Sequence, residues 1–191
     1  MKKGLLILLS GPSGVGKGTV RKIVFNDESL NLAYSISMTT RLPRAKEVDG
    51  VDYFLVREEE FIKRLNNNEF LEHAKFVGNY YGTPKSYVEK LREEGKNVFL
   101  EIEVEGAKQV LSQYKDDDKV VSIFLLPPSL EELEKRIRGR RSEEEHIIQE
   151  RLSKDKIEIV LKSNYQYAVL NDNIYRAGDE IVEIIRANLN K

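Results

Sequence analysis

An apolar run near the amino end, Leu5 to Leu9, leads directly into the glycine-rich segment Ser10 to Thr19. A short apolar run bounded by glycines is typical of a buried strand, and a helical pattern follows it. Glycines allow successive backbone N–H groups to converge on one point, toward which the helix also directs its positive end. Phosphate is the natural occupant of such a loop, and Lys17 adds a mobile positive charge. The junction therefore predicts nucleotide chemistry.

The spacing of Gly11, Gly16 and Lys17 fits the pattern Gly-x-x-x-x-Gly-Lys of a phosphate-binding loop. The alternative, a glycine turn between a strand and a helix, would not need a lysine and so many glycines together. Gly18 stands where the usual motif has the Ser or Thr that helps to hold Mg²⁺, and the hydroxyl follows at Thr19, which leaves the direct metal ligand open. We expect phosphate to be bound by Gly11, Pro12, Ser13, Gly14, Val15, Gly16, Lys17, Gly18 and Thr19.

Length and charge restrict the class of protein. A chain of 191 residues can bury one substantial core, so we expect a single domain over residues 1–191. Its 31 Lys and Arg nearly balance 32 Asp and Glu, whereas a protein that binds nucleic acid without sequence preference would have a basic excess. We therefore expect no nucleic-acid partner. Because the chain has no cysteine, neither disulfides nor a cysteine zinc cluster can stabilise it, which suits a reducing cytoplasm.

The apolar stretches are too short for a membrane segment. The longest have about five residues, whereas a helix that spans a bilayer needs about 20. The amino-terminal Met1-Lys2-Lys3 leads into the predicted strand and does not resemble a cleavable signal. We expect a cytoplasmic protein without a membrane partner.

Short apolar runs alternate with amphipathic segments along most of the chain, which predicts an α/β fold with a three-layer arrangement, a parallel sheet between flanking helices. Buried strands are predicted over residues 5–9, 98–102, 120–126 and 168–170. Helices are predicted over 17–25, 84–94, 105–114, 130–138, about 143–163 and 180–189. Ser129 with Glu132 and Ser142 with Glu145 fit capping boxes at helix starts. Right-handed crossovers in such a sheet place ligands at the carboxyl ends of the strands, where the glycine loop lies.

The segment from about residue 34 to 83 has a different pattern, and we expect it to form an inserted lobe. Short strands are predicted over 34–38, 51–56 and 76–82, around a helix at 58–67. The segment is rich in tyrosine, which supplies both apolar mass and hydroxyl donors. The core is then expected to consist of residues 1–33 and 84–191.

Several strings of the chain follow one another in the order and spacing of a known family. They are Thr39-Thr40-Arg41-Leu42-Pro43-Arg44, Gly50-Val51-Asp52-Tyr53-Phe54, Phe70-Leu71-Glu72-His73-Ala74 and Gly78-Asn79-Tyr80-Tyr81-Gly82-Thr83. With these strings the chain resembles the guanylate kinases, the ATP-dependent enzymes that phosphorylate GMP, over residues 4–188. The resemblance implies a P-loop NTPase fold, an insert at about 34–83 that binds GMP, and a short lid at about 136–151.

Arg41 and Arg44 are candidates for binding the acceptor's phosphate. Pro43 favours an extended segment, in which two guanidinium groups three residues apart can converge on one dianion. Solvation of both arginines at the surface is the alternative. The resemblance implies that Tyr53 and Tyr81 contact the same phosphate through their hydroxyl groups, the alternative being core rings with hydroxyls at the surface.

A carboxylate suits the Watson–Crick edge of guanine, which presents two adjacent donors, N1–H and the 2-amino group. The resemblance assigns this role to Glu72, with hydroxyl contacts from Ser37 and Thr83 and a further acidic contact from Glu103. Without the resemblance, Glu72 before His73 would be taken as part of a solvated face. His73 and His146 have no third partner at metal-binding spacing, so we assign neither a metal role.

The remaining expected residues concern the metal and the donor nucleotide. Glu101 ends a predicted strand, a usual place for an acidic residue that orients Mg²⁺ or its waters, and Thr19 is the second candidate ligand. The resemblance implies that Arg136, Arg140 and Arg151 bind phosphates and, with Lys17 and Arg41, stabilise the phosphoryl group in flight. It also implies that Asn171 contacts the adenine, although an Asn-Asp turn would look the same. Arg141 stands where many members of the family have glycine.

The resemblance implies transfer of a phosphoryl group from MgATP to GMP, with dGMP as a further acceptor left open, in a monomer or homodimer. Three alternatives remain: a kinase for AMP or dTMP on the same scaffold, an inactive interaction domain of the same fold, and an NTP-hydrolysing switch. Glu72 and Thr83 argue against the first, the intact loop around Lys17 against the second, and the monophosphate-site residues against the third.

Overall fold

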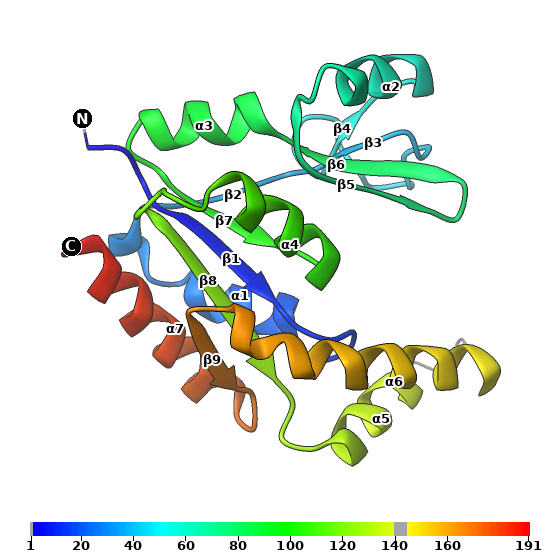
Figure 1. The fold of residues 1–191 in the computed structure, drawn as a ribbon, viewed down its shortest axis with the longest axis vertical. Helices are drawn as coiled ribbons and strands as arrows, with labels where there is room; N and C mark the ends of the chain where they lie inside the picture. Colours follow the sequence, from blue (N-terminus) through cyan, green and yellow to red (C-terminus); the bar gives the residue numbers. More distant parts are fainter. Residues whose placement is uncertain (1, 140–144) are drawn as a thin grey trace.

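Five parallel strands form the central sheet of the protein, in the order β2-β7-β1-β8-β9 (Figure 1). A computed structural model describes residues 2–139 and 145–191. The strands are β1 (Leu6–Ser10), β2 (Leu32–Tyr34), β7 (Asn97–Glu101), β8 (Val120–Leu126) and β9 (Tyr167–Leu170). Since every neighbouring pair is parallel, the carboxyl ends of all five strands meet at one edge of the sheet.

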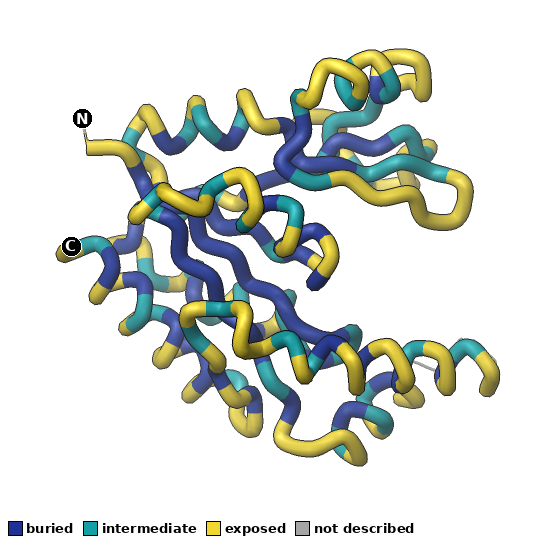
Figure 2. The backbone as a smooth tube through the Cα atoms, viewed as in Figure 1, coloured by how far each residue is buried: buried dark blue, intermediate teal, exposed yellow. Residues whose placement is uncertain are grey.

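Helices cover both faces of this sheet, so β1 is buried along its whole length (Figure 2). Alternate residues of β1 join different core clusters. Ile7 packs in a cluster with apolar residues of α1 and α7, whereas Leu8 packs in a cluster with residues of α3 and α4. A strand buried on both faces needs a continuous apolar run, as the sequence has here. The predicted three-layer α/β fold is confirmed.

The helices of the described core follow the sequence prediction with one large difference. Their bounds are α1 (Lys17–Val24), α3 (Lys85–Glu93), α4 (Val104–Gln113), α5 (Leu130–Arg138), α6 (Glu145–Val160) and α7 (Ile174–Leu189), with short 3₁₀ turns at Glu28–Leu30 and Leu161–Asn164. Helix α7 begins six residues before the predicted start at 180, because the Asn173 side chain accepts hydrogen bonds from the N–H groups of Tyr175 and Arg176 and caps it there.

The capping prediction at Ser129 is confirmed, since its hydroxyl accepts the Glu132 N–H at 3.1 Å. The second predicted cap, at Ser142, lies outside the described residues, as do Arg140, Arg141 and part of the expected lid at 136–151. No helix in the described part of the chain is long and apolar enough to cross a membrane.

A second, smaller sheet has the strand order β4-β3-β6-β5 and is called the small sheet below. Its strands are β3 (Met38–Thr39), β4 (Phe54–Leu55), β5 (Phe70–Phe76) and β6 (Asn79–Pro84). Helix α2 (Glu58–Asn66) packs on it through Phe61, whose ring stacks on Phe70 with centroids 4.4 Å apart. Figure 1 shows this sheet projecting beside the central sheet, beyond α3 and α4.

Two strand predictions in this region were wrong. The strand expected over 76–82 is a hairpin turn, because the backbone reverses at Val77 and Gly78, both with positive φ, and joins β5 to β6. Tyr34, expected within a strand of the lobe, belongs to β2, which pairs with β7 in the central sheet. Strand pairing between distant segments decided both cases, and the sequence pattern does not contain it.

Arg92 joins α3 to the start of the central sheet. Its side chain is fully buried, and its Nε donates to the Gly4 carbonyl at 3.0 Å. Its two terminal nitrogens donate to Glu89 and Asp117, each at 2.9 Å. A buried charge is tolerated only when it is paired and hydrogen-bonded, and Arg92 satisfies both conditions.

Replacement of Arg92 by Met should lower the free energy of unfolding by about 3–5 kcal/mol, because Glu89 and Asp117 lose their buried partner. Arg64→Met is the matched control, since Arg64 pairs with Glu60 and Glu69 at the surface. That change should cost less than about 1 kcal/mol. Equal losses in urea unfolding would show that Arg92 contributes no more than a surface ion pair.

Candidate functional site

The segment from Gly11 to Thr19, called the glycine loop below, joins the carboxyl end of β1 to α1. Gly11 and Gly16 have φ values of 149° and 103°, which favour glycine. A Cβ atom would lie 2.5 Å from the Leu125 carbonyl oxygen at Gly11, and 2.8 Å from the Asn171 side-chain nitrogen at Gly16. The loop therefore needs glycine at both positions, for its backbone angles and for its close contacts.

The glycine loop borders a hollow of about 420 Å³ at the edge of the sheet. Its lining residues are Ser13, Gly14, Gly16, Lys17, Gly18, Thr19, Arg21, Lys22, Glu101 and Glu103. Lys17 donates to the Gly11 carbonyl at 2.6 Å and lies 3.7 Å from a Glu103 oxygen. The lysine is thus surrounded by oxygen atoms, the same kind of partner that a phosphate group offers.

Two of the predicted donor-site residues support the loop from behind. The Asn171 side-chain amide donates to the Val15 carbonyl at 2.8 Å and is buried. Arg136 donates to the same carbonyl at 3.3 Å and to the Asn171 carbonyl at 3.5 Å. Both side chains therefore hold the backbone of the loop in place, and their contacts with a donor nucleotide stay predictions.

Glu101 and Thr19, the predicted metal ligands, line the same hollow. Glu101 ends β7 in register with Leu9 of β1, and its carboxylate lies 3.4 Å from Arg21. A Cβ atom at Gly18 would lie 3.5 Å from Glu101, so this carboxylate faces the start of α1. No group of three His, Asp or Glu side chains suited to a metal exists among the described residues. The carboxylate and hydroxyl oxygens fit Mg²⁺ as two protein ligands beside phosphate and water.

The aromatic and basic residues predicted for the acceptor's phosphate gather beside the small sheet. The Tyr53 and Tyr81 rings lie 6.5 Å apart, and the Arg41 guanidinium lies 5.4 Å from the Tyr53 ring centre. Arg44, by contrast, is exposed and enters this cluster only through its backbone.

Glu47 is a residue of this cluster that the sequence analysis missed. Arg41 donates to both of its carboxylate oxygens, at 2.8 and 2.9 Å, and the Arg44 N–H donates to one of them at 2.9 Å. The hydrogen bonds from Arg41 lower the pKa of Glu47. An acidic residue shortly after two arginines was the available sequence signal. The carboxylate holds the Arg41 fork in the geometry that two phosphate oxygens would need.

Glu72 and Thr83 face each other across β5 and β6. The Thr83 hydroxyl donates to Glu72 at 2.6 Å, and burial raises the pKa of the Glu72 carboxyl. A Cβ atom at Gly106, in the first turn of α4, would lie 3.1 Å from the other Glu72 oxygen. Ser37 lies at the adjoining edge, half-buried, where its carbonyl accepts the Phe54 N–H.

The start of α4 connects the two groups of residues. Glu103 immediately precedes this helix and approaches Lys17, whereas Gly106, three residues later, approaches Glu72. On a helix such residues share one face. Of the predicted lid residues, Arg151 is half-buried in α6, and Arg140 lies outside the described residues.

Helix α6 carries two buried acids, Asp155 and Glu158, that the sequence analysis also missed. Burial raises the pKa of both carboxyls. Asp155 accepts the Ser13 N–H of the glycine loop at 3.1 Å. Charged residues on a helix are usually solvated, so the sequence held no signal for this contact.

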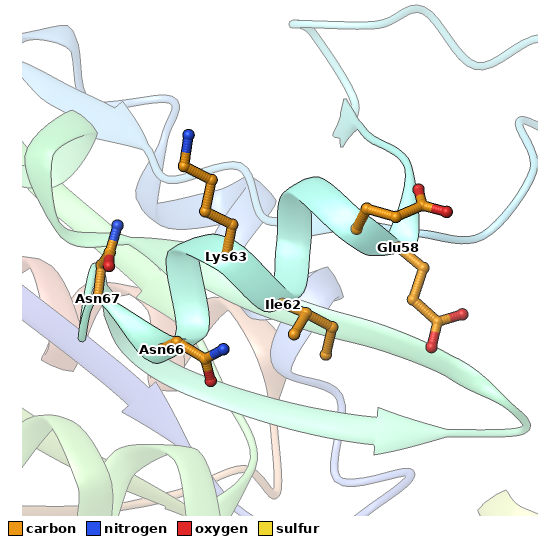
Figure 3. Close-up of a pocket in the computed structure, with 6 residues that line it drawn as sticks. Glu58, Ile62, Lys63, Asn66 and Asn67 are labelled. Carbon is orange, nitrogen blue, oxygen red and sulfur yellow. The ribbon is translucent and has the colours of Figure 1, made fainter.

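A hollow of about 710 Å³ lies elsewhere, along the outer surface of α2. Figure 3 shows that the labelled side chains of Glu58, Lys63 and Asn66 point in different directions from this helix. Because polar groups there do not converge, the hollow has the character of a surface groove and not of a ligand site.

Comparison with known proteins agrees with this arrangement. The family model "Guanylate kinase" matches residues 3–188. A guanylate kinase of Mycoplasma capricolum is 53% identical over 97% of this chain, which spans 61% of that relative's length, and one of Bacillus cereus is 55% identical over 96% of this chain and 88% of its own. The crystal structure of guanylate kinase from Anaplasma phagocytophilum superimposes with a TM-score of 0.75 at 34% identity, covering 100% of this chain and 88% of that one. The chain belongs to the guanylate kinase family.

Proposed function

We propose that this protein transfers the γ-phosphoryl group of ATP to GMP, giving ADP and GDP. The observation that carries the proposal is the buried Glu72–Thr83 pair, which lies on the small sheet next to α4 while the glycine loop lies at the other end of the same helix turn. A phosphate-binding loop alone fits any NTPase. A second polar hollow with a carboxylate suited to guanine favours a guanylate acceptor.

We assign the donor side to the glycine loop, with Lys17 and Arg136 neutralising the phosphates and Asn171 beside the adenine. Thr19 and Glu101 would hold Mg²⁺, directly or through water, and the metal would neutralise charge on the donor's terminal phosphates. We further assign Arg140 and Arg151 to the transferred group, as part of a lid over about 136–151. The insert, about 34–83, would close over GMP and the lid over ATP, which excludes water from the transfer.

On the acceptor side, the phosphate of GMP would exchange with Glu47 for the Arg41 fork and would receive hydrogen bonds from Tyr53 and Tyr81, with Arg44 closing from the surface. Glu72 would accept N1–H and the 2-amino group of guanine. The adjacent base contacts would come from Ser37, Thr83 and Glu103. Specificity then rests on hydrogen bonds, because adenine cannot satisfy a buried carboxylate at this edge.

The transfer itself needs no general base from the protein. A phosphate oxygen of GMP is already anionic near neutral pH and attacks the γ-phosphorus in line. The bond from that phosphorus to the bridging oxygen breaks, and the electron pair leaves with ADP. The protein must instead hold two polyanions together, which explains why lysine and arginine predominate among the assigned residues.

Phosphoryl transfer from MgATP should be measured as ADP formation with GMP, dGMP, AMP, dTMP or UMP as acceptor. We expect rapid turnover with GMP and at least about a hundredfold lower kcat/KM with AMP, since a buried carboxylate left unpaired costs on the order of 3 kcal/mol. A folded Lys17→Met variant is the control for the loop and should lose transfer. Equal rates with AMP, ATP turnover without an acceptor, or no transfer at all would each favour one of the three alternative functions.

Replacement of Glu72 by Gln should lower kcat/KM for GMP about 10- to 100-fold and leave the KM for ATP unchanged, because one charge-assisted acceptor is lost. Since burial raises the pKa of Glu72, the advantage of the wild type should shrink as the pH falls through that pKa and the carboxylate becomes protonated. Glu69→Gln, at the surface pair with Arg64, is the matched control. A change confined to ATP affinity would contradict the base-binding role.

Replacement of Gly18 by Ser should lower the Mg²⁺ concentration that gives half-maximal activity, by about threefold, because it restores a hydroxyl ligand beside Glu101. The added Cβ atom would make ordinary contacts, at 3.5 Å from that carboxylate. Gly18→Ala adds the same carbon without the oxygen and is the control. If both variants respond to Mg²⁺ alike, this end of the hollow does not hold the metal.

A further inference from the structure

Asp155 places a carboxylate against the glycine loop. Its Oδ1 accepts the Ser13 N–H at 3.1 Å, across 142 residues of sequence. The residue is only 1% exposed, and its Oδ2 has no hydrogen-bond partner within residues 2–139 and 145–191. A buried carboxylate oxygen without a partner is costly, so its retention at this position calls for a functional explanation.

The donor that Asp155 occupies belongs to the hollow beside the loop. Ser13 lines that hollow together with Gly16 and Lys17. Backbone N–H groups of such loops are donors for phosphate oxygens, and a carboxylate oxygen is an acceptor of the same charge. A phosphate oxygen and the Asp155 carboxylate therefore compete for the same backbone hydrogen.

The charges around Asp155 are mixed. Lys17 in the loop and Lys154 on the same helix attract its carboxylate, whereas Glu103 before α4 and Glu158 in α6 repel it. Glu158 is itself buried, is paired with Lys154 at 3.4 Å, and has an unpartnered oxygen. Arg151 lies one helical turn before Asp155. A polyphosphate in the hollow would add negative charge where two buried acids already stand.

We propose that Asp155 determines the affinity of the donor site: its carboxylate competes with the donor's phosphates for the Ser13 N–H and weakens their binding. The inference rests on the proposed function, since it takes the glycine loop as the donor site. Asp155 acts on the donor through the loop and through its charge. Loss of the charge should therefore strengthen binding, which distinguishes this role from that of an anchor for α6.

The test is calorimetric titration of the full chain with MgATP and, separately, with magnesium tripolyphosphate, which carries the phosphates without the base. Asp155→Asn keeps the shape and an acceptor oxygen for Ser13 but removes the charge, and it should bind both probes about tenfold more tightly than the wild type. Glu150→Gln, on the exposed side of α6, is the matched control and should change either affinity less than about twofold.

The pH dependence separates charge from shape. Since burial raises the pKa of Asp155, the wild type gains affinity as the pH falls through that pKa and the carboxylate becomes neutral. The ratio of the two dissociation constants, wild type to Asp155→Asn, should therefore approach one at low pH. Asp155→Ala, which also lacks the charge, serves as the second variant if Asp155→Asn does not fold.

Each remaining outcome contradicts a specific statement. If Asp155→Asn equals the wild type and Asp155→Ala binds more weakly, Asp155 is an anchor for α6 and the inference is wrong. If both variants bind more weakly, the carboxylate assists binding, which also overturns it. If the wild type binds neither probe, the proposed function itself fails, and this result is distinguishable because it needs no variant.

Discussion

The backbone of the glycine loop is the constraint on which the remaining structure depends. Gly11 and Gly16 have positive φ, and the Leu125 carbonyl and the Asn171 amide lie so close that any larger residue would collide. These contacts come from β8 and from the residue after β9, so the loop takes its shape from the central sheet. Its N–H groups point to a common site only because the sheet behind them is rigid and buried on both faces.

The cations near the two hollows share one property: each already has an oxygen partner in the protein. Lys17 contacts the Gly11 carbonyl, Arg21 contacts Glu101, and Arg41 contacts Glu47. Such partners keep long side chains in one conformation, which reduces the entropy lost when a ligand binds. They also mean that a phosphate group must exchange with an existing acceptor, so electrostatic affinity in this protein is a difference between two sets of contacts.

The sequence predicted what local patterns encode and missed what distant pairing decides. The run before the glycine loop predicted β1, and Ser129 predicted the start of α5, because burial and capping act within a few residues. The hairpin at Val77 and Gly78 depends on β5 and β6 finding each other. Asp155 was missed because its partner, Ser13, lies 142 residues away. The roles assigned to individual site residues remain predictions.

The first turn of α4 has a consequence for how the two halves of the proposed site are related. Glu103 approaches Lys17 and Gly106 approaches Glu72, so a single helical turn forms a wall shared by both hollows. The separation of the two ligands is then measured by a rigid ruler anchored in the main core, while the small sheet supplies the far side. A displacement of this turn would shift both ligands at once, and the spacing between reacting groups would be preserved even as the surrounding lobes open and close.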